Sequence, residues 1–519
     1  MKKLASIFLV CIMTIIFCFS CSSGGQTQKP TVKTTSGKIS GSIEDGIFTF
    51  KGIPYAKAER FMPPQAPDSW KGILECTKFS PVAMQGNGSA SDSTMDEKKL
   101  FTVNVWTQGL DDGKKRPVML WIHGGGFASG SSNDPVTYGT MLAKKGDIVL
   151  VSVNHRLNIL GFLDLSEYGE KYASSANVGM LDLVASLEWI NKNIEEFGGD
   201  PGNVTIFGES GGGGKVATLL CMPAAKGLFH KAIIQSGTLL NIMDKEKSTR
   251  ITRALMDILG LTADQVTRLD TIPYRKLVQT GNQALARTVG MRTPGTAKMF
   301  GFGPVPDGVN LLQQPFSPDF ADISKDVPVM IGTTFNELRR TAYAEKNLTM
   351  EQAVERIKKS YGEKADKYIE LFGKSYPGYS PQDLLSIDTV FRPYTIMVAN
   401  AWSRKSAAPV YAYMLTWKSP VEDSTRGSFH GLDIALAFNN IDLGQKQWTG
   451  NGEDAYALAE KMSSAWLHFA KTGNPNVENV LPQWRPYSRE NGETMIFDRE
   501  CRTVNNHDRE LMYLIKPVD

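Results

Sequence analysis

The feature that most constrains the fold is a serine between glycines, directly after a buried apolar run. The four residues Val204–Phe207 favour β-structure, and Gly208–Gly212 then fits the pattern Gly-x-Ser-x-Gly. A helix is expected next, so Ser210 should lie at the tip of a sharp strand–turn–helix unit. Such a turn strains the serine backbone and exposes its oxygen, and the helix N-terminus favours developing negative charge. The motif alone also occurs by chance, so its surroundings must decide whether Ser210 is a nucleophile.

A second glycine cluster follows another expected strand, 117–122. That strand leads into His123, three glycines and Phe127. Backbone N–H groups that leave a sheet ladder can point into a cavity instead, so Gly125 and Gly126 are predicted to bind an oxyanion, with the N–H of Gly211 as a third donor. The plain alternative is a glycine-rich turn that merely ends the strand.

Strands and helices alternate around these two loops. We expect an edge strand at 46–56, buried strands at 103–106 and 147–156, a helix from about 182 to 197, and later strands at 327–331 and 411–417. This order is typical of a mostly parallel sheet with helices on both faces, an α/β fold. Segments 240–320 and 341–404 are expected to be inserted helices and loops that cover the mouth of the site.

The N-terminus carries an export signal. Two lysines precede an apolar run from Ile7 to Phe19, which is too short to cross a membrane as a mature helix. We therefore interpret residues 1–20 as a signal peptide. Cys21 then opens a polar tether, 21–36, in a pattern that resembles a bacterial lipoprotein processing site. The residues before Ser20 are not the leucine and small residue usual there, so plain cleavage and a soluble secreted protein is the alternative.

Composition argues against several classes of protein. The formal net charge of +3 falls to about +1 when Lys2 and Lys3 leave with the signal, so no nucleic-acid partner is indicated. Outside the signal region only Cys76, Cys221 and Cys501 remain, an odd and scattered set that predicts no disulfide framework. Because no repeat or long linker marks a boundary, residues 37–519 are expected to form a single domain.

Together these motifs resemble the type-B carboxylesterases, in the cholinesterase and carboxylesterase-lipase superfamily of α/β-hydrolases. The resemblance extends from about Gly41 nearly to the C-terminus. Its matching segments are Gly52–Ala56, His123–Phe127, Asn154 with Arg156, Phe197–Pro201, Phe207–Gly213 and Gln235–Gly237. It implies an α/β-hydrolase fold with a large, mostly parallel sheet, and closing strands at 484–487 and 494–497.

The resemblance also implies the partners of Ser210. The family places its acid on a Gly-x-x-x-x-Glu turn after a later strand, and Glu337 falls there. It places its base in a His-Gly-x-acid segment, which gives His430. The chain order nucleophile, acid, base is the order this fold requires. Glu209 and Ser236 match positions that support the histidine, although both could be ordinary polar residues beside a site.

Two other carboxylates compete with Glu337 for the acid role. Asp388 lies in an inserted segment and resembles a supporting position. Asp433 follows His430 by only three residues and is expected to cap the next helix. Glu337 follows a predicted strand at the edge of the sheet where this fold gathers catalytic groups, so we prefer it.

The chain also departs from the family pattern. The family ion pair with Arg60 is in doubt, unless Asp96 or Glu97 supplies the carboxylate from a shifted register. No aromatic residue occurs between Met84 and Leu100, where cholinesterases hold a quaternary ammonium, so choline esters are not expected as substrates. Gly211 replaces the commoner alanine, which keeps the N–H and is expected to loosen the backbone.

We therefore predict a serine carboxylesterase that hydrolyses small-molecule esters through an acyl-enzyme, with no metal or organic cofactor. With His430 as base, kcat/KM should fall on acidification through an apparent pKa of about 6–7. We expect export to the cell envelope, in the periplasm or at the outer membrane, with attachment through a lipidated Cys21. The alternatives are a noncatalytic binding protein on the same fold, or an enzyme for acyl or feruloyl groups on polysaccharide, an amide or a thioester.

Overall fold

The computed structural model describes residues 29–86, 94–238, 242–289, 301–317, 319–443 and 446–517. The predicted signal peptide and Cys21 lie outside these residues. Across the described ranges, no helix combines the length and apolar character needed to cross a membrane.

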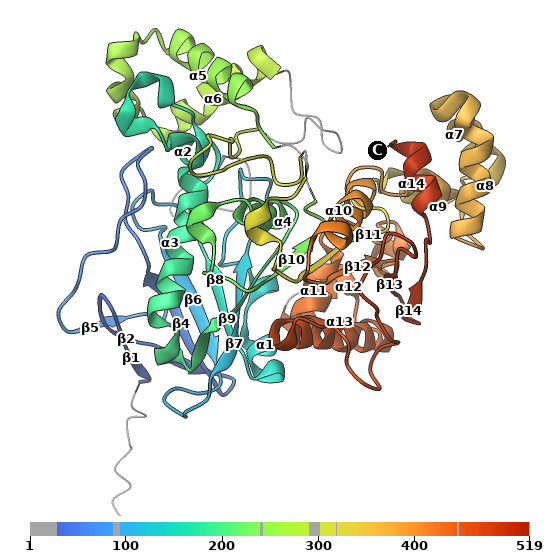
Figure 1. Cartoon of the computed structure of the whole chain (residues 1–519), viewed down its shortest axis with the longest axis horizontal. Coiled ribbons are helices and arrows are strands. Elements are labelled where there is room, and N and C mark those ends of the chain that lie inside the picture. The colour runs from blue at the N-terminus through green and yellow to red at the C-terminus, as the bar shows by residue number, and fades with distance from the viewer. Residues whose placement is uncertain are drawn as a thin grey trace, which may run out of the picture.

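A large sheet occupies the centre of the molecule (Figure 1). Six neighbouring strand pairs in its middle are parallel, and the four pairs toward its two edges are antiparallel. Within the described residues its strands, in spatial order, are β14 (Arg502–Val504), β13 (Thr494–Phe497), β12 (Val410–Leu415), β11 (Val329–Thr334), β10 (Lys231–Gln235), β9 (Gly199–Glu209), β7 (Arg116–Ile122), β8 (Val149–Val153), β6 (Thr102–Thr107), β4 (Ile47–Pro54) and β3 (Ser42–Glu44).

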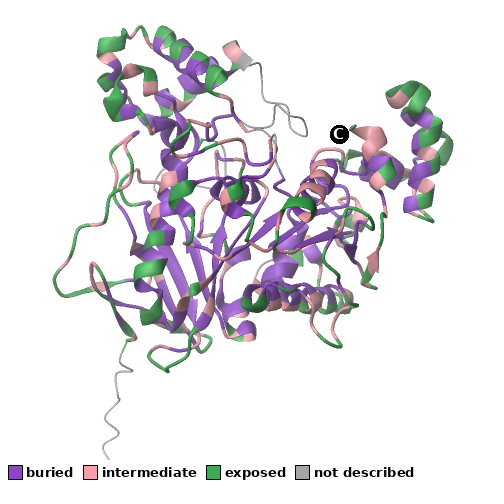
Figure 2. Cartoon of the chain, viewed as in Figure 1, coloured by how far each residue is buried: buried purple, intermediate pink, exposed green. Residues whose placement is uncertain are grey.

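Both faces of this sheet are buried, because side chains alternate along each strand. In β7, Val118, Leu120 and Ile122 belong to one core, and Met119 and Trp121 belong to the other. The inner strands β8, β10, β11 and β12 are accordingly buried along their whole length, and the middle of the sheet is purple in Figure 2. The first core is covered by α3 (Val178–Asn193), α4 (Gly211–Leu219) and α10 (Arg392–Lys405), and the second by α1 (Thr140–Gly146), α11 (Leu432–Phe438) and α13 (Glu453–Thr472).

The N-terminal edge differs from the prediction in two ways. The expected edge strand is β4, but β4 pairs with β6 on one side and β3 on the other, because the turn at Asp45 and Gly46 (φ 51° and 81°) folds β3 back as the true edge. The folded domain also begins before residue 37. β1 (Thr31–Thr34) lies in the predicted tether and pairs with β2 (Gly37–Ser40) in a small sheet with β5 (Ile73–Glu75), which buries Val32.

The inserted segments form two separate helical groups (Figure 1). One contains α2 (Asn158–Phe162), α5 (Lys245–Leu259) and α6 (Tyr274–Val289) and packs onto the first core. The other contains α7 (Met350–Tyr361), α8 (Ala365–Ser375), α9 (Pro381–Ser386) and the C-terminal helix α14 (Arg509–Ile515), which share a third core of their own. A buried ion pair links this second group to α10, since Arg392 Nη2 lies 2.7 Å from Asp508 Oδ1.

Near the C-terminus, the strand expected at 484–487 is absent from the described residues. Trp484 donates its N–H to Asn476 Oδ1 (2.6 Å), and only Tyr487 donates to the sheet, to Val410 O (2.7 Å). Pro486 between them has no N–H to add to a ladder. The short helix α12 (Lys446–Thr449) precedes α13, and the sheet ends in β13 and β14.

Candidate active site

Ser210 lies at the junction of β9 and α4, with φ 57° and ψ −122°, a strained conformation for a residue with a side chain. Its N–H donates to Gln235 O on the neighbouring strand (2.9 Å), which fixes the turn. The flanking glycines are needed for close packing. A Cβ on Gly208 would lie 2.5 Å from Ile122 O, and one on Gly212 would overlap the same oxygen. The predicted strand–turn–helix unit is therefore present.

His430 lies between Ser210 and Glu337. Its Nε2 is 2.8 Å from Ser210 Oγ, and its Nδ1 makes a short hydrogen bond with Glu337 Oε2. The backbone supports this contact, because the N–H of His430 donates to Glu337 O (3.1 Å). The ring of Phe391 lies parallel to the imidazole, with centroids 5.4 Å apart and planes 9° apart, so it limits how the ring can turn.

The second oxygen of Glu337 is also occupied. Oε1 accepts hydrogen bonds from Ser236 Oγ (2.6 Å) and from the N–H of Thr334 (2.8 Å). Glu337 lies on the turn after β11 with φ 45°, and Ser236 follows β10 with φ 48°. Two bonds to one oxygen orient the carboxylate, so its other oxygen faces the imidazole.

The other two carboxylates proposed for the acid role bond elsewhere. Asp388 accepts from the backbone N–H groups of Val390 (2.8 Å) and Phe391 (2.9 Å), so it holds the turn that carries the stacked phenylalanine. Asp433 accepts from Gln235 Nε2 (3.0 Å) and from the hydroxyl of Tyr413 (2.8 Å).

The expectation that Asp433 caps a helix is wrong. The N-cap of α11 is Gly431, and Asp433 lies inside the first turn with its side chain turned into the core. In this position its carboxylate accepts from the buried donors Gln235 and Tyr413, which a side chain facing solvent could not reach.

Glu209 approaches the histidine from the nucleophile's own strand. Its Oε1 is 3.4 Å from His430 Nε2, and the side chain is buried. Burial, and then the nearby Asp433 and Glu337, raise the pKa of Glu209 to about 8. Burial alone would lower the pKa of His430, but the surrounding carboxylates, with Glu209 and Glu337 first, outweigh it and raise that pKa to about 10. These carboxylates therefore favour the imidazolium.

The glycine loop lies against the start of α4. Gly125 and Gly126 have φ of 90° and 59°, and the carbonyl of Gly125 accepts from the N–H groups of Ala128 (3.0 Å) and Ser129 (3.1 Å), which closes a tight turn. None of the hydrogen bonds among the described residues uses the N–H of Gly125 or Gly126. The N–H of Gly211 lies in the first turn of α4, where helix donors have no partner within the helix.

Gly211 has a further reason to lack a side chain. A Cβ there would overlap the backbone nitrogen of Gly126. The glycine that stands in place of the commoner alanine thus lets the helix and the loop approach each other, which places the three expected N–H donors on neighbouring backbone.

Arg60 does form an ion pair, and Glu97 supplies its carboxylate, as expected for a shifted register. Arg60 donates to Glu97 through Nε (2.5 Å to Oε2) and through Nη2, and its Nη1 donates to the carbonyls of Leu269 (3.1 Å) and Ile272 (2.6 Å). Arg60 and Glu97 also line a cavity of about 480 Å³ between the N-terminal segment and the first inserted group.

Sequence reasoning missed several residues of the site. Phe391 stacks on His430 and lies in no recognisable motif, and Thr334 binds Glu337 from a position that the Gly-x-x-x-x-Glu pattern leaves unspecified. Asp388 drew attention to the segment, but the stacking itself depends on tertiary packing. In the described part of the chain, no group of three or more His, Cys, Asp or Glu side chains could hold a metal ion.

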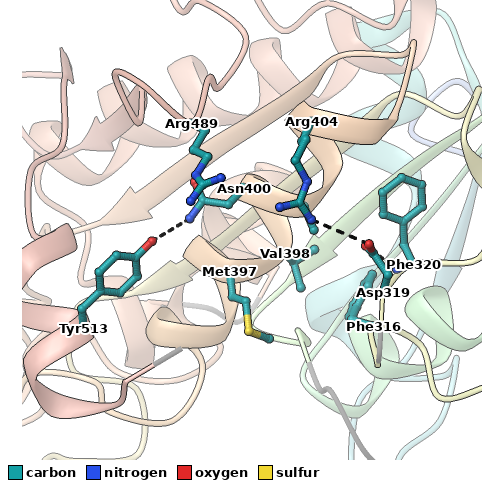
Figure 3. Close-up of a pocket in the computed structure, with 10 residues that line it drawn as sticks. Phe316, Asp319, Phe320, Met397, Val398, Asn400, Arg404, Arg489 and Tyr513 are labelled. Atoms are coloured by element: carbon teal, nitrogen blue, oxygen red, sulfur yellow. Dashed lines mark hydrogen bonds and ion pairs between the residues drawn. The ribbon is translucent and has the colours of Figure 1, made fainter. Parts of the chain in front are cut away.

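A separate cavity of about 140 Å³ lies beside the C-terminal half of α10 (Figure 3). Phe316 and Phe320 form one wall, and Arg404 there pairs with Asp319 at 3.8 Å. Neither Ser210 nor His430 lines this cavity, so it is distinct from the site described above.

Comparison with known proteins gives a consistent result. The sequence model of the carboxylesterase family matches residues 28–513. Para-nitrobenzyl esterase of Bacillus subtilis (strain 168) is 34% identical over 496 residues, which cover 92% of this chain and 97% of that protein. Phenmedipham hydrolase of Pseudarthrobacter oxydans is 31% identical over 507 residues, which cover 92% of this chain and 96% of that protein.

The solved structures agree with these matches. An esterase from the anaerobe Clostridium hathewayi, described as able to hydrolyse aliphatic aromatic polyesters, has a TM-score of 0.84 at 37% identity and covers 94% of this chain and 98% of its own. The predicted α/β-hydrolase fold, with a mostly parallel sheet and inserted helices, is confirmed by these neighbours. The chain belongs to the carboxylesterase family, and its reaction is the hydrolysis of carboxylic esters.

Proposed function

We propose that Ser210, His430 and Glu337 form the catalytic triad of this carboxylesterase. The observation that carries the proposal is the arrangement of the imidazole, with Ser210 Oγ 2.8 Å from Nε2 and Glu337 on Nδ1. His430 takes the proton of Ser210 as Oγ attacks the ester carbonyl carbon. Glu337 holds the imidazole in the tautomer with its proton on Nδ1 and stabilises the imidazolium that forms.

The negative oxygen of the tetrahedral intermediate is held by the N–H groups of Gly125, Gly126 and Gly211. Collapse of this intermediate breaks the bond to the alcohol, which leaves with the proton from His430. Water then attacks the acyl-enzyme, with His430 again as base, and releases the acid and free Ser210. The free N–H groups of the glycine loop and the close contact of Gly211 with Gly126 support this assignment.

Glu209 and Ser236 support the histidine in different ways. Ser236 orients Glu337 through its hydrogen bond to Oε1, and Glu209 brings a carboxyl group within 3.4 Å of Nε2, which stabilises the imidazolium when that carboxyl group is ionised. Neither side chain exchanges a proton with the substrate in this scheme.

A fluorophosphonate probe tests the nucleophile. We expect the probe to attach to Ser210, and we expect Ser210→Ala to lose turnover by several orders of magnitude while it keeps the fold. Ser464→Ala, on α13, is the control and should be labelled like the wild type. Undiminished labelling of Ser210→Ala would place the nucleophile elsewhere, and no labelling of the wild type would favour a noncatalytic binding protein.

The substrate class is a small-molecule ester. Two relatives carry aromatic groups in their descriptions, a para-nitrobenzyl ester and aliphatic aromatic polyesters, so aromatic esters belong in the first screen. The screen varies the acyl and the alcohol parts separately and includes feruloyl esters, an amide and a thioester. If the rate depends on the size of only the acyl part or only the alcohol part, the pocket that binds that part selects the substrate.

We also propose that the enzyme is exported to the cell envelope and anchored through a lipidated Cys21. The basis is the apolar run before Ser20 and the polar segment after Cys21. Cys21→Ala should release the protein into the soluble fraction or block processing of the signal. A wild-type protein that is soluble and has no acyl chains by mass spectrometry would contradict the anchor and favour secretion.

A further inference from the structure

One lysine is buried beside the active site without a carboxylate partner. Lys215 lies on α4, five residues after the nucleophile, and its side chain is fully buried. Its Nζ donates to the carbonyl oxygen of His123 (2.9 Å) and lies 5.5 Å from the ring centroid of Phe127. None of the ion pairs among the described residues includes it. Because lysine is almost never fully buried unless its charge is paired, this position needs an explanation.

The glycines of α4 explain how the side chain reaches the loop. A Cβ on Gly212 would overlap Ile122 O and lie 3.0 Å from His123 O. The first turn of α4 therefore packs directly against the backbone that enters the glycine loop. From the next turn, Lys215 extends along this contact to the last carbonyl before the three glycines.

Two buried imidazoles lie on the same side of the loop. The rings of His123 and His155 are stacked, with centroids 4.8 Å apart, and the Nε2 atom of each is buried without a hydrogen-bond partner among the described residues. Burial, followed by the charge of Lys215, lowers the pKa of both histidines, so both are neutral. Burial also lowers the pKa of Lys215 itself, to about 7. The amine donates a hydrogen bond in either protonation state, so its contact with His123 does not depend on its charge.

The loop between His123 and Phe127 has an anchor at each end. At its far end, Phe127 O accepts from the N–H of Asn158 (2.7 Å). At its near end, His123 O accepts from Lys215 Nζ. The three glycines between these anchors have no side chains to hold them, and glycine has the largest backbone freedom of any residue. The direction of their N–H groups therefore depends on these two anchors together with the bonds that their own carbonyls accept, from His123 Nδ1 to Gly124 O (3.0 Å) and from Ala128 and Ser129 to Gly125 O.

We propose that Lys215 is a positioning residue for ester hydrolysis, which fixes the peptide after His123 so that the N–H groups of Gly125 and Gly126 point at the reacting carbonyl. The proposal rests on the oxyanion role of these glycines given above. Lys215 acts through the loop and touches neither the substrate nor His430.

The test is Lys215→Met, which keeps an unbranched side chain of nearly the same length and removes the donor. Removal of a buried, unpaired amine should leave the melting temperature unchanged or higher, whereas the loop loses its near anchor. We expect kcat to fall about 10- to 100-fold with KM within about threefold, since the contact acts in the transition state and small misplacements have large effects on rate. A trifluoromethyl ketone, which forms a tetrahedral oxyanion on the enzyme, should bind more weakly by a similar factor.

Thr218→Val is the matched control. Thr218 is buried on the same helix, and its hydroxyl bonds to Gly214 O (2.8 Å), away from the glycine loop. Its kcat and its affinity for the ketone should stay within about twofold of the wild type, because such a change disturbs packing alone. If Lys215→Met does not fold, Lys215→Leu, which also lacks the donor, is measured in the same way.

An unchanged kcat in a folded variant without the amine would overturn the proposal, and so would a loss of kcat with full affinity for the ketone. These results are separate from a failure of the triad, because fluorophosphonate labelling of Ser210 and the inactivity of Ser210→Ala do not depend on Lys215. Recovery of kcat in Lys215→Gln, relative to Lys215→Met, would support the proposal further, since glutamine restores a neutral donor.

Discussion

The two sides of Ser210 differ in the kind of ionisable side chain that is buried there. On the histidine side, four buried carboxylates (Glu209, Glu337, Asp388 and Asp433) cluster around His430 and its partner Glu337. On the glycine-loop side, the buried ionisable groups are bases (Lys215, His123 and His155). Attack on an ester creates positive charge on the imidazole and negative charge on the carbonyl oxygen. The carboxylates therefore favour the imidazolium, whereas on the glycine-loop side, where both histidines are neutral, the backbone N–H groups are the donors proposed to favour the oxyanion.

The four carboxylates on the histidine side also differ in what they contact. Glu337 contacts the imidazole, whereas Asp388 accepts hydrogen bonds from backbone N–H groups and Asp433 accepts them from side chains. Four substitutions, taken in decreasing order of their effect on activity, test whether contact or charge matters on each side.

The largest effect is expected for Glu337→Gln. Glutamine can still bond to the ring, but it favours the wrong tautomer and cannot stabilise the imidazolium. In the serine proteases the analogous change from aspartate to asparagine lowers kcat by about 10⁴, and we expect a fall of about 10³- to 10⁴-fold here. Steady-state kinetics of the folded variant checks this. Near-normal turnover, together with collapse in Asp388→Asn, would transfer the acid role to Asp388.

The next effect lies on the other side of Ser210, in Gly211→Ala. The added Cβ overlaps the nitrogen of Gly126, so the helix and the loop must separate. We expect kcat to fall about tenfold or more, with a smaller change in KM, because an oxyanion donor moves. Gly227→Ala is a control for glycine replacement, since a Cβ there meets no atom within 4 Å, although its φ of 80° adds backbone strain. Equal loss of kcat in both variants would mean that the contact with Gly126 is unimportant.

A smaller effect is expected in the pH profile of Glu209→Gln. In the proposed mechanism activity requires neutral His430, and the surrounding carboxylates raise the pKa of His430 above its ordinary value. We therefore expect kcat/KM of the wild type to fall on acidification through an apparent pKa above about 7, the upper end of the range expected from sequence. Removing the charge of Glu209 lowers the pKa of His430, which shifts this limb to lower pH. The pH dependence of kcat/KM measures the shift. A limb that stays in place would show that Glu209 is neutral throughout.

The smallest effect is expected for Asp433→Asn. Its amide oxygen can still accept from Gln235 and Tyr413, so the packing is kept and only a distant charge is removed. We expect kcat within about fivefold of the wild type, since the carboxylate makes no contact with the imidazole. A loss as large as that of Glu337→Gln, in a protein with normal melting temperature, would mean that charge rather than contact decides the acid role.

Local sequence predicts much of this site because its chemistry depends on backbone turns. The glycines around Ser210 and after His123 exist because strands and helices pass closely there, and such turns leave a readable pattern. The structure also brings His430 and Glu337 to Ser210 as the family pattern implied. Their catalytic roles remain a proposal for the experiments above.

What sequence could not predict depends on tertiary contacts. The stacking of Phe391 on His430 joins an inserted segment to a loop 39 positions later (430 − 391), and nothing local encodes it. The position of β4 inside the sheet depends on the β3 hairpin, and the partners of Asp433 come from two other strands. Lys215 occurs in an apolar helix without a motif, so only its buried position draws attention to it.

The buried ion pair between Arg392 and Asp508 has a consequence for how the enzyme fails on heating. It ties α10, whose start carries Phe391, to the segment before the C-terminal helix α14, and α14 packs in the small third core with α7 and α8. A small core of this kind can open while the large sheet stays intact. Hydrogen exchange should then be fastest in these helices, and the enzyme would become inactive through fraying at its C-terminus while most of its structure is still native.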